Sequence, residues 1–390
     1  MLQNINPKKK VAQINHWDIP SPSTPVHTKD DSEFLCSYSW KQTPTATIYV
    51  PGTPSKWTPP SLPTQLAPDN GLHYVDQHLE RVPVYPFEPI FQSLAVMNPS
   101  IRFNDVDIVI NRNTIQKLLL FASHKRTYGA FHVNLDMVGN TLFIDRQDRY
   151  AKTNTQSGYG RNFEADFTTD DPDLVDAEGH HRVIRYDLGR LNVVLRMEAD
   201  GYIAPDAPLE ADGATTESIT PPHPSSTRSD TPFEDQFSDL CLTAKPTHTP
   251  TIPIPHTLAT TVIAAGTPTP HPHSLELKSS VSKTLAREQI WFGRVPHLVF
   301  AKHKNGLVKA LDESRWDEND FEDWAEKHQW QLRRLVWLLE ELREVAVRKA
   351  GGHAVLVAVE KGAPLQIFEA KTAKGALPRE IVERFWGRGV

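Results

Sequence analysis

The chain has 390 residues and a formal net charge of −6, so it is not a uniformly basic nucleic-acid clamp. A local basic groove inside an acidic envelope remains compatible with RNA binding. Only two cysteines occur, Cys36 and Cys241, both in Pro/Ser/Thr-rich sequence, which argues against a disulfide framework or a zinc site. No apolar run approaches the ~18 residues needed to span a membrane, so we expect no membrane partner.

The first 80 residues are rich in Pro, Thr and Ser and lack sustained periodicity. We predict that residues 1–80 form a disordered N-terminal region, with only a local strand near 45–50. The basic run Lys8, Lys9 and Lys10 favours a solvated tail, with a nuclear import signal as the alternative. We expect a nuclear protein; the cytosol also fits the cysteine usage.

Order is predicted to begin near Val82. Hydrophobic spacing and turn residues predict the following elements: a short strand or turn at 105–110, a helix at 114–122, a hairpin at 131–145 with its turn at Gly139-Asn140, a helix around Phe163, and strands at 182–187 and 191–198.

From 204 to 272 the composition changes sharply, with 13 of the chain's 32 prolines and few large apolar residues. This segment is predicted to be a flexible, disordered insertion. The elements predicted after it are strands at 274–279 and 297–302, a helix at 281–292 between them, a turn at Asn305-Gly306 followed by another strand, one helix at 324–348, strands at 353–360 and 365–369, and a short helix at 377–386. This order indicates an α/β or α+β domain over residues 81–390, with a central mixed sheet flanked by helices.

Three acidic motifs lie on these elements. Glu164 follows Phe163, Glu198 and Asp200 end the strand at 191–198, and Glu276 and Lys278 lie on the strand at 274–279. Side chains at i and i+2 of a strand point to the same face. If the two strands pair, three carboxylates and one ammonium converge, and Glu164 could approach from a neighbouring helix.

Such a cluster would repel itself without a cation. Mg²⁺ and Mn²⁺ prefer oxygen ligands, and a bound metal can activate water and neutralise charge on a phosphate. Lys278 would then orient water or stabilise the transition state. Taken singly, each triplet is also compatible with an ordinary exposed strand.

The order of the motifs resembles the PD-(D/E)XK nuclease superfamily and, within it, the decapping exoribonuclease (DXO) family. The family's arginine segment is matched at 111–119, its Gly-x-Lys-Phe-Glu motif at 160–164, its Glu-Val-Asp motif at 198–200, its Glu-Leu-Lys-Thr motif at 276–279, and its helix ending in Gly-Val-Pro at 289–296. These matches occur in the family's order over residues 105–310.

The resemblance implies a metal-dependent hydrolase of RNA 5′ ends, acting as a decapping or pyrophosphohydrolase enzyme on incompletely capped or 5′-triphosphate RNA. Such enzymes act in mRNA quality control, and some continue as 5′–3′ exoribonucleases. The implied metal ligands for Mg²⁺ or Mn²⁺ are Glu164, Glu198, Asp200 and Glu276. Lys278, with Glu198 and Asp200, would be catalytic, and Arg112 and Gln289 would bind the substrate.

Several features depart from that family. Some 70 residues separate the second and third motifs, and Asn111 and Asn113 replace the Trp and Gly that flank the family's arginine. These changes leave the metal set intact but bear on which 5′ end is accepted. The alternative is a catalytically weak scaffold that binds RNA or stabilises a partner 5′–3′ exoribonuclease. A DNA nuclease of the same superfamily is a third reading, although we expect RNA rather than DNA.

A basic cluster precedes the second motif. It consists of His180, His181, Arg182 and Arg185. It is compatible with contacts to an RNA backbone and equally with a solvated loop and strand edge.

Overall fold

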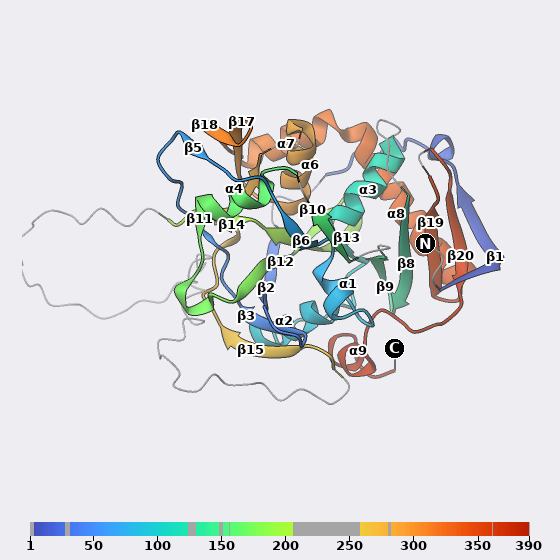
Figure 1. Ribbon diagram of the computed structural model, residues 1–390. Helices are drawn as coiled ribbons and strands as arrows, with labels where there is room; N and C mark the ends of the chain where they lie inside the picture. Colours follow the sequence, from blue (N-terminus) through green and yellow to red (C-terminus); the bar gives the residue numbers. More distant parts are fainter. Residues whose placement is uncertain are drawn as a thin grey trace, which may run out of the picture.

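The computed structural model describes residues 4–27, 32–123, 130–147, 151–155, 157–205, 258–279, 282–360 and 362–389. Figure 1 shows strands through the middle of the molecule, with helices placed around them. The described residues form two large sheets and one two-stranded sheet.

The larger sheet has 11 strands. In spatial order they are β1 (Ile5–Ile14), β20 (Leu365–Ala370), β19 (His353–Ala358), β8 (Phe131–Val138), β9 (Thr141–Arg146), β7 (Ile108–Asn111), β13 (Leu191–Ala199), β12 (Ala177–Leu188), β2 (Glu33–Lys41), β3 (Thr47–Pro51) and β15 (Thr261–Ala265). The sheet is mixed, because β7 runs parallel to β13 and β9 whereas β12 pairs antiparallel with β13 and β2. The predicted mixed α/β fold is confirmed.

The second sheet has seven strands. They are β11 (Thr168–Thr169), β4 (Lys56–Trp57), β14 (Gly201–Tyr202), β16 (Ser274–Lys278), β17 (His297–Lys304), β18 (Leu307–Arg315) and β5 (Thr64–Gln65). A separate pair joins β10 (Lys152–Thr155) to β6 (Gly71–Tyr74). The chain passes from the first sheet to the second where β13 ends and β14 begins.

The described helices pack against both of the large sheets. They are α1 (Gln77–Arg81), α2 (Glu88–Met97), α3 (Arg112–Ser123), α4 (Gly160–Phe167), α6 (Lys283–Gly293), α7 (Glu318–Lys327), α8 (Gln329–Lys349) and α9 (Arg379–Phe385). Short 3-10 turns occur at His16–Asp18, Pro172–Leu174 and His271–His273. None of the described helices is both long and apolar enough to cross a membrane.

Strand β13 shows why the sheet is buried on both faces. Leu195 points into the core beneath α3 and α8, whereas Val194 points into the core that α2 and α9 cover. A strand covered on both faces reads as a continuous apolar run rather than an alternating one. The packing on both faces therefore fixes the C-terminal end of β13, where Glu198 and Asp200 are located.

The helix predicted at 324–348 is instead two helices, α7 and α8. The backbone leaves helical geometry at His328, whose ring stacks on Trp324 with centroids 3.9 Å apart. The Nδ1 atom of His328 also lies 2.7 Å from the carbonyl oxygen of Trp324. The apolar stripe itself was predicted correctly, because its members are buried in α8: Leu332, Leu335, Val336, Leu339, Leu342 and Val345.

The prediction of a disordered region over residues 1–80 is wrong for the part of it that the structure describes. Strands β1, β2 and β3 belong to the larger sheet, and Lys8 to Lys10 lie on β1 rather than in a tail. Strand β2 lies between β12 and β3 and is buried on both faces, with Leu35 and Cys36 in the core. The Pro- and Thr-rich segments beside these strands hide their pattern.

The predicted insertion needs new bounds. Residues 206–257 lie outside the described residues, but 258–272 are described. Strand β15 pairs in parallel with β3, and Glu88 Oε1 accepts hydrogen bonds from the backbone amides of Ala259 and Thr260 at 2.9 and 2.7 Å. The end of the segment is therefore part of the fold, fixed by pairing with the N-terminal strands.

A matched pair of substitutions tests the structural role of the N-terminal region. Leu35 is 3% exposed and Leu72 is 67% exposed. We expect Leu35→Ala to lower the free energy of unfolding by about 2–5 kcal/mol, because it leaves a cavity in the core. Leu72→Ala should change it by less than about 0.5 kcal/mol. Urea denaturation measures both, and equally small effects would contradict the fold described for residues 33–41.

Candidate active site

A fully buried carboxylate lies where the two sheets meet. Glu276 on β16 is 0% exposed, and Arg112, at the first position of α3, binds it with both terminal nitrogens. The distances are 2.8 Å from Nη1 to Oε2 and 3.2 Å from Nη2 to Oε1. This bidentate arrangement offsets the cost of burying the carboxylate.

Lys278 completes the charge pairing from the same strand face as Glu276. Its Nζ lies 2.6 Å from Glu276 Oε1 and 3.0 Å from Asp200 Oδ2. Asp200 lies between β13 and β14, and its Oδ2 also accepts a hydrogen bond from the backbone amide of Leu277 at 2.8 Å. The predicted proximity of Asp200, Glu276 and Lys278 is therefore present, although β16 pairs with β14 rather than with β13.

Glu164 reaches this region from α4, a short helix whose start is fixed from outside. Asp69 accepts the backbone amides of Arg161 and Asn162 at 3.3 and 3.0 Å, in the way that an N-terminal capping residue does. Phe163, the residue after Asn162, is fully buried in the core of the second sheet. The cap and the buried ring together fix the direction in which Glu164 projects.

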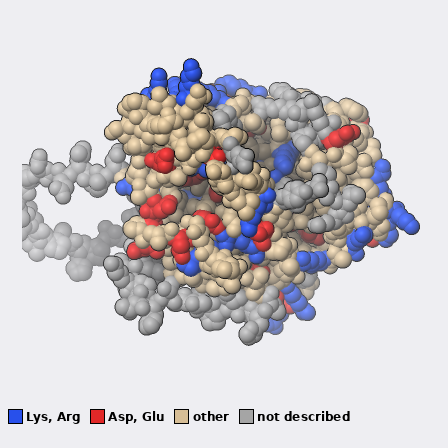
Figure 2. Space-filling model, viewed as in Figure 1, with Lys and Arg blue, Asp and Glu red and all other residues tan. Residues whose placement is uncertain are grey.

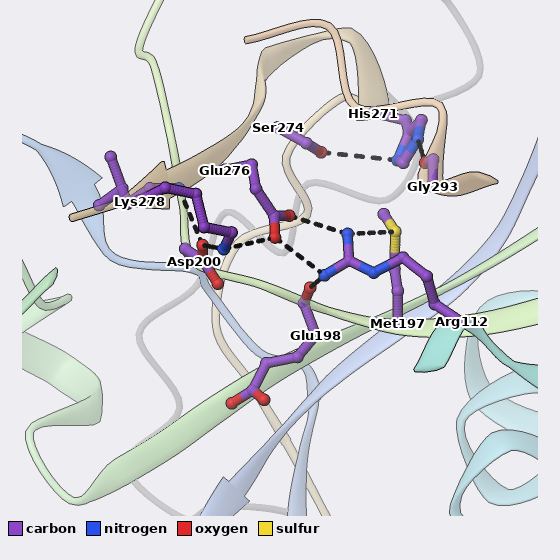
Figure 3. A network of polar contacts seen from close by, with 10 residues as sticks. Arg112, Met197, Glu198, Asp200, His271, Ser274, Glu276, Lys278 and Gly293 are labelled. Carbon is purple, nitrogen blue, oxygen red and sulfur yellow. Dashed lines mark hydrogen bonds and ion pairs between the residues drawn. The ribbon is translucent and has the colours of Figure 1, made fainter. Parts of the chain in front are cut away.

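Glu198 is the acid whose orientation differs from the expectation. Figure 3 shows its carboxylate pointing away from Asp200 and Glu276, while its backbone carbonyl oxygen accepts from Arg112 Nη2 at 3.2 Å. The carboxylate passes close to Gly179, where a Cβ would lie 3.0 Å from Glu198 Oε1 and 2.8 Å from Gln77 Nε2. Gly179 has φ +60°, so glycine is favoured there by conformation as well as by space.

Two adjoining cavities open beside these acids. The first has a volume of about 430 Å³ and is lined by Arg112, Gln289, Glu164 and Glu198 among others. The second, of about 260 Å³, shares Glu164 and Glu198 and adds Asp200. Figure 2 shows the hollow on this face, with acidic and basic side chains gathered around it. The predicted substrate residues Arg112 and Gln289 therefore line the same space as two of the acids.

The acids that face the cavities hold protons more readily than usual, because the fold does not fully compensate a negative charge on them. Burial, and then the charge of Asp200, raises the pKa of Glu198 to about 7. The same two causes raise the pKa of Glu164 well above its usual value. Glu276 is the opposite case, because Arg112 and Lys278 outweigh the effect of burial and hold its pKa below the usual range. Lys278 stays protonated, since Asp200 and Glu276 outweigh its burial and raise its pKa.

These residues fit a divalent cation by their chemistry. Glu164, Glu198 and Asp200 offer carboxyl oxygens, which is the donor set that Mg²⁺ and Mn²⁺ prefer, and a cation would take the place of the protons that their raised pKa values favour. Within the described ranges, however, no three His, Cys, Asp or Glu side chains converge as a ready ligand set. The four-carboxylate convergence expected from the sequence is not formed, because Glu276 is occupied by Arg112 and Lys278 and Glu198 is turned away. The metal-ligand assignment stays a prediction.

Sequence reasoning missed several residues that line the larger cavity. Four polar atoms in its wall are buried and have no hydrogen-bond partner in the described structure: His73 Nε2, Gln77 Oε1, His181 Nε2 and Gln289 Oε1. His73 and Gln77 lie in the region predicted to be disordered, which is why they were overlooked. Arg161 also lines this cavity, and it could have been predicted from the sequence because it lies in the same motif as Glu164.

The basic cluster before the second motif is not a solvated loop. His180, His181 and Arg182 are at most 6% exposed on β12. Burial lowers the pKa of both histidines well below the usual value, so their rings are neutral. Arg182 donates to the carbonyl and hydroxyl oxygens of Thr269. Only His181 and His180 border the cavities, so Arg182 serves the packing of the fold.

Solved structures of Rai1 have this fold. A crystal structure of Rai1 from S. pombe matches with a TM-score of 0.54 and 14% identity, covering 92% of this chain and 98% of that chain. The same protein in complex with 3′-FADP matches with a TM-score of 0.54 and 13% identity, over the same shares of both chains. Rai1 from Scheffersomyces stipitis, in complex with (3′-NADP)⁺ and a calcium ion, matches with a TM-score of 0.56 and 10% identity, covering 96% of this chain and 99% of that chain. No curated protein matches the chain.

The fold is therefore that of the Rai1 proteins, and the predicted resemblance to the decapping exoribonuclease family is confirmed at the level of the fold. A sequence model described as "Domain of unknown function (DUF8563)" matches residues 9–386. The chain belongs to the DUF8563 family.

The buried pair of Arg112 and Glu276 can be tested by a double-variant cycle. We expect Arg112→Met to lower the free energy of unfolding by about 3–5 kcal/mol, because it leaves Glu276 underpaired in the interior. Adding Glu276→Gln should recover at least half of that loss. Arg379→Met, which breaks the exposed pair with Glu383, should cost less than about 1 kcal/mol. Urea denaturation measures the wild type, both single variants, the double variant and the Arg379→Met control. Additive effects of Arg112→Met and Glu276→Gln would contradict the pairing.

Proposed function

We propose that this chain is a divalent-metal-dependent hydrolase that acts on phosphate bonds at RNA 5′ ends. The observation that carries the proposal is the set of Lys278, Asp200 and Glu276 beside a cavity faced by Glu164 and Glu198. The similarity of the fold to Rai1 supports the same proposal. The order of the sequence motifs, which resembles that of the decapping exoribonuclease family, is a second support.

Each residue of the set has a role that follows from its contacts. Glu164, Glu198 and Asp200 would hold the metal, which when bound supplies an activated water and a positive charge beside a phosphate. Asp200 Oδ2 is engaged by Lys278 and the Leu277 amide, so Oδ1 is the oxygen that it would offer. Lys278 acts as a cation and hydrogen-bond donor through Nζ, not as a base, because its two carboxylate partners keep it protonated.

Arg112 would play a different part from the one expected, whereas Gln289 would keep its predicted part in substrate binding. Both terminal nitrogens of the Arg112 guanidinium donate hydrogen bonds to Glu276. This side chain would therefore position Glu276 and Lys278 rather than bind a phosphate. Gln289 borders the cavity from α6 and is available to hydrogen-bond a substrate. Arg161, at the same cavity, is a second cation for the RNA end.

The second candidate function is a catalytically weak scaffold with the same fold, which binds RNA or supports a partner 5′–3′ exoribonuclease. The observation that favours it is the absence, among the residues that the structure describes, of a preformed set of three metal ligands. A scaffold need not bind a metal, so metal affinity separates the two readings. We propose a nuclear location, with the cytosol as the alternative; Lys8 to Lys10 are exposed on β1 and open to recognition there.

Activity on defined 5′ ends tests the enzyme reading. RNA carrying a 5′-triphosphate or an unmethylated cap is incubated with the protein and Mg²⁺ or Mn²⁺, and released products are quantified. The Glu198→Ala, Asp200→Ala double variant should lose at least about 100-fold in rate, because it removes the groups proposed to hold the metal. The exposed pair Glu322→Ala, Glu326→Ala on α7 is the matched control and should be fully active.

Two outcomes would count against this proposal. One is equal hydrolysis by the wild-type protein and the Glu198→Ala, Asp200→Ala variant, and the other is no hydrolysis of any 5′ end by the folded wild-type protein. A 2′-deoxy competitor in the same assay decides between RNA and DNA, since the 2′-hydroxyl is what distinguishes the two at a binding site.

A further inference from the structure

A separate polar cavity lies against β8 and β9. Its volume is about 180 Å³, and its described lining residues are distinct from those of the two cavities beside the acids. One wall is formed by the sheet, and the opposite wall by residues 83–87 and 372–376. We call it the β8–β9 cavity.

The sheet wall presents hydrogen-bonding groups that the fold leaves unused. His132, Asn134 and Asp136 alternate along β8 and so point to the same face, and Asp145 on β9 lies directly opposite Asn134. His132 is 4% exposed, and in the described structure neither its Nε2 nor Asn134 Oδ1 has a hydrogen-bond partner. Buried polar groups are nearly always satisfied, so orphaned atoms lining a cavity indicate a missing ligand or water.

The same wall carries a carboxyl group without a cationic partner. Asp145 is 7% exposed and accepts a hydrogen bond from the Gln147 amide at 2.5 Å. Neither Asp145 nor Asp136 forms an ion pair with Lys374 in the described structure. The Lys374 ammonium instead lies 5.4 Å from the centre of the Tyr85 ring. Asp136 is paired with His353, whose Nδ1 is 2.7 Å away.

These groups define the kind of ligand that would be complementary to the cavity. Acceptors dominate the sheet wall, and one of them is a buried carboxyl in need of a positive charge. Among the described lining residues, Asp145 is the carboxyl outside an ion pair, since Asp136 is paired with His353. One carboxyl suits a singly charged group better than a divalent cation, which prefers several oxygen ligands. The opposite wall includes Pro83, Pro86 and Phe87, which offer an apolar surface. A guanidinium group matches both walls, since it is a flat, weakly hydrated cation with donors along its edge.

We propose that the β8–β9 cavity binds a guanidinium group, with Asp145 as its counter-ion and Asn134 and His132 as further hydrogen-bond acceptors. The guanidinium could belong to a small molecule or to an arginine side chain, and the chemistry is the same. This site is independent of the proposed hydrolase function.

The charge state of Asp145 gives the proposal a pH signature. Burial, and then the charge of Asp76, raises its pKa to about 8, with Arg196 and Asp136 as the other charged neighbours. The carboxyl is therefore protonated near pH 7 and must release its proton when a cation binds. His132 stays neutral there, since burial lowers its pKa to about 4. Lys374 is the remaining charged group in the wall, and burial lowers its pKa. A guanidinium stays charged throughout, so affinity should rise from about pH 6 to about pH 8 and then level off.

Isothermal titration calorimetry of the full chain tests this site. The probes are methylguanidinium for a small ligand, N-acetylarginine amide for a side chain, and urea as an uncharged group of similar shape. We expect one or both cations to bind and urea not to bind. Titrations in buffers of different ionisation enthalpy should show about one proton released at pH 7 and almost none at pH 9. The stronger of the two cationic probes identifies the source of the group.

Variants locate the binding. Asp145→Asn should weaken binding at least about tenfold and abolish proton release, whereas the exposed control Asp173→Asn should change neither. If Asp145→Asn does not fold, Val84→Trp serves instead, because Val84 is 48% exposed at the cavity wall and a larger side chain should block entry. The proposal is overturned if neither cation binds, if urea binds as well as the cations, or if Asp145→Asn or Val84→Trp binds as the wild type does.

Discussion

The candidate site depends on a carboxylate that is completely buried between two cations. Glu276 has no access to solvent, and removing either Arg112 or Lys278 would leave its charge underpaired in the interior. Arg112 stands at the start of α3 beside the larger sheet, whereas Glu276 and Lys278 lie on β16 of the second sheet. The ion pair therefore links the two sheets, and the positions of the acids around it are set by how the two sheets meet.

This arrangement divides the acids into two kinds. The negative charge of Glu276 is balanced by Arg112 and Lys278. Glu164 and Glu198 face the cavity with raised pKa values, because no described cation fully balances a negative charge on them. Asp200 belongs to both groups, with one oxygen held by Lys278 and Leu277. This division explains how a site without a preformed ligand set can still be complementary to a divalent cation. The cation would bind the cavity-facing acids, while the buried pair of Arg112 and Glu276 keeps the surrounding backbone in place.

Local elements could be predicted from the sequence wherever periodicity is strong, as in α3, the β8–β9 hairpin and the apolar stripe of α8. The proximity of Glu276 and Lys278 could be predicted because they lie two residues apart on one strand, where side chains share a face. The same rule failed for Glu198 and Asp200, because β13 ends at Ala199. Long-range features were not predictable. The partner of Arg112 depends on how α3 meets β16, which no spacing encodes. Strand β2 was missed because it is buried on both faces and lies between Pro- and Thr-rich segments. His73 and Gln77, which line the larger cavity, were missed because they lie in the same region that was predicted to be disordered.

The proposed hydrolase function requires that the cavity-facing carboxylates bind a divalent cation. Electron paramagnetic resonance of free Mn²⁺ during titration with the protein tests it directly, with Mg²⁺ as competitor. The wild-type chain should remove Mn²⁺ from solution, and the Glu164→Gln, Glu198→Gln variant should bind at least about tenfold more weakly. The exposed Glu322→Gln, Glu326→Gln variant should bind as the wild type does. No Mn²⁺ binding by the folded wild-type protein, or equal binding by all three proteins, would contradict the claim.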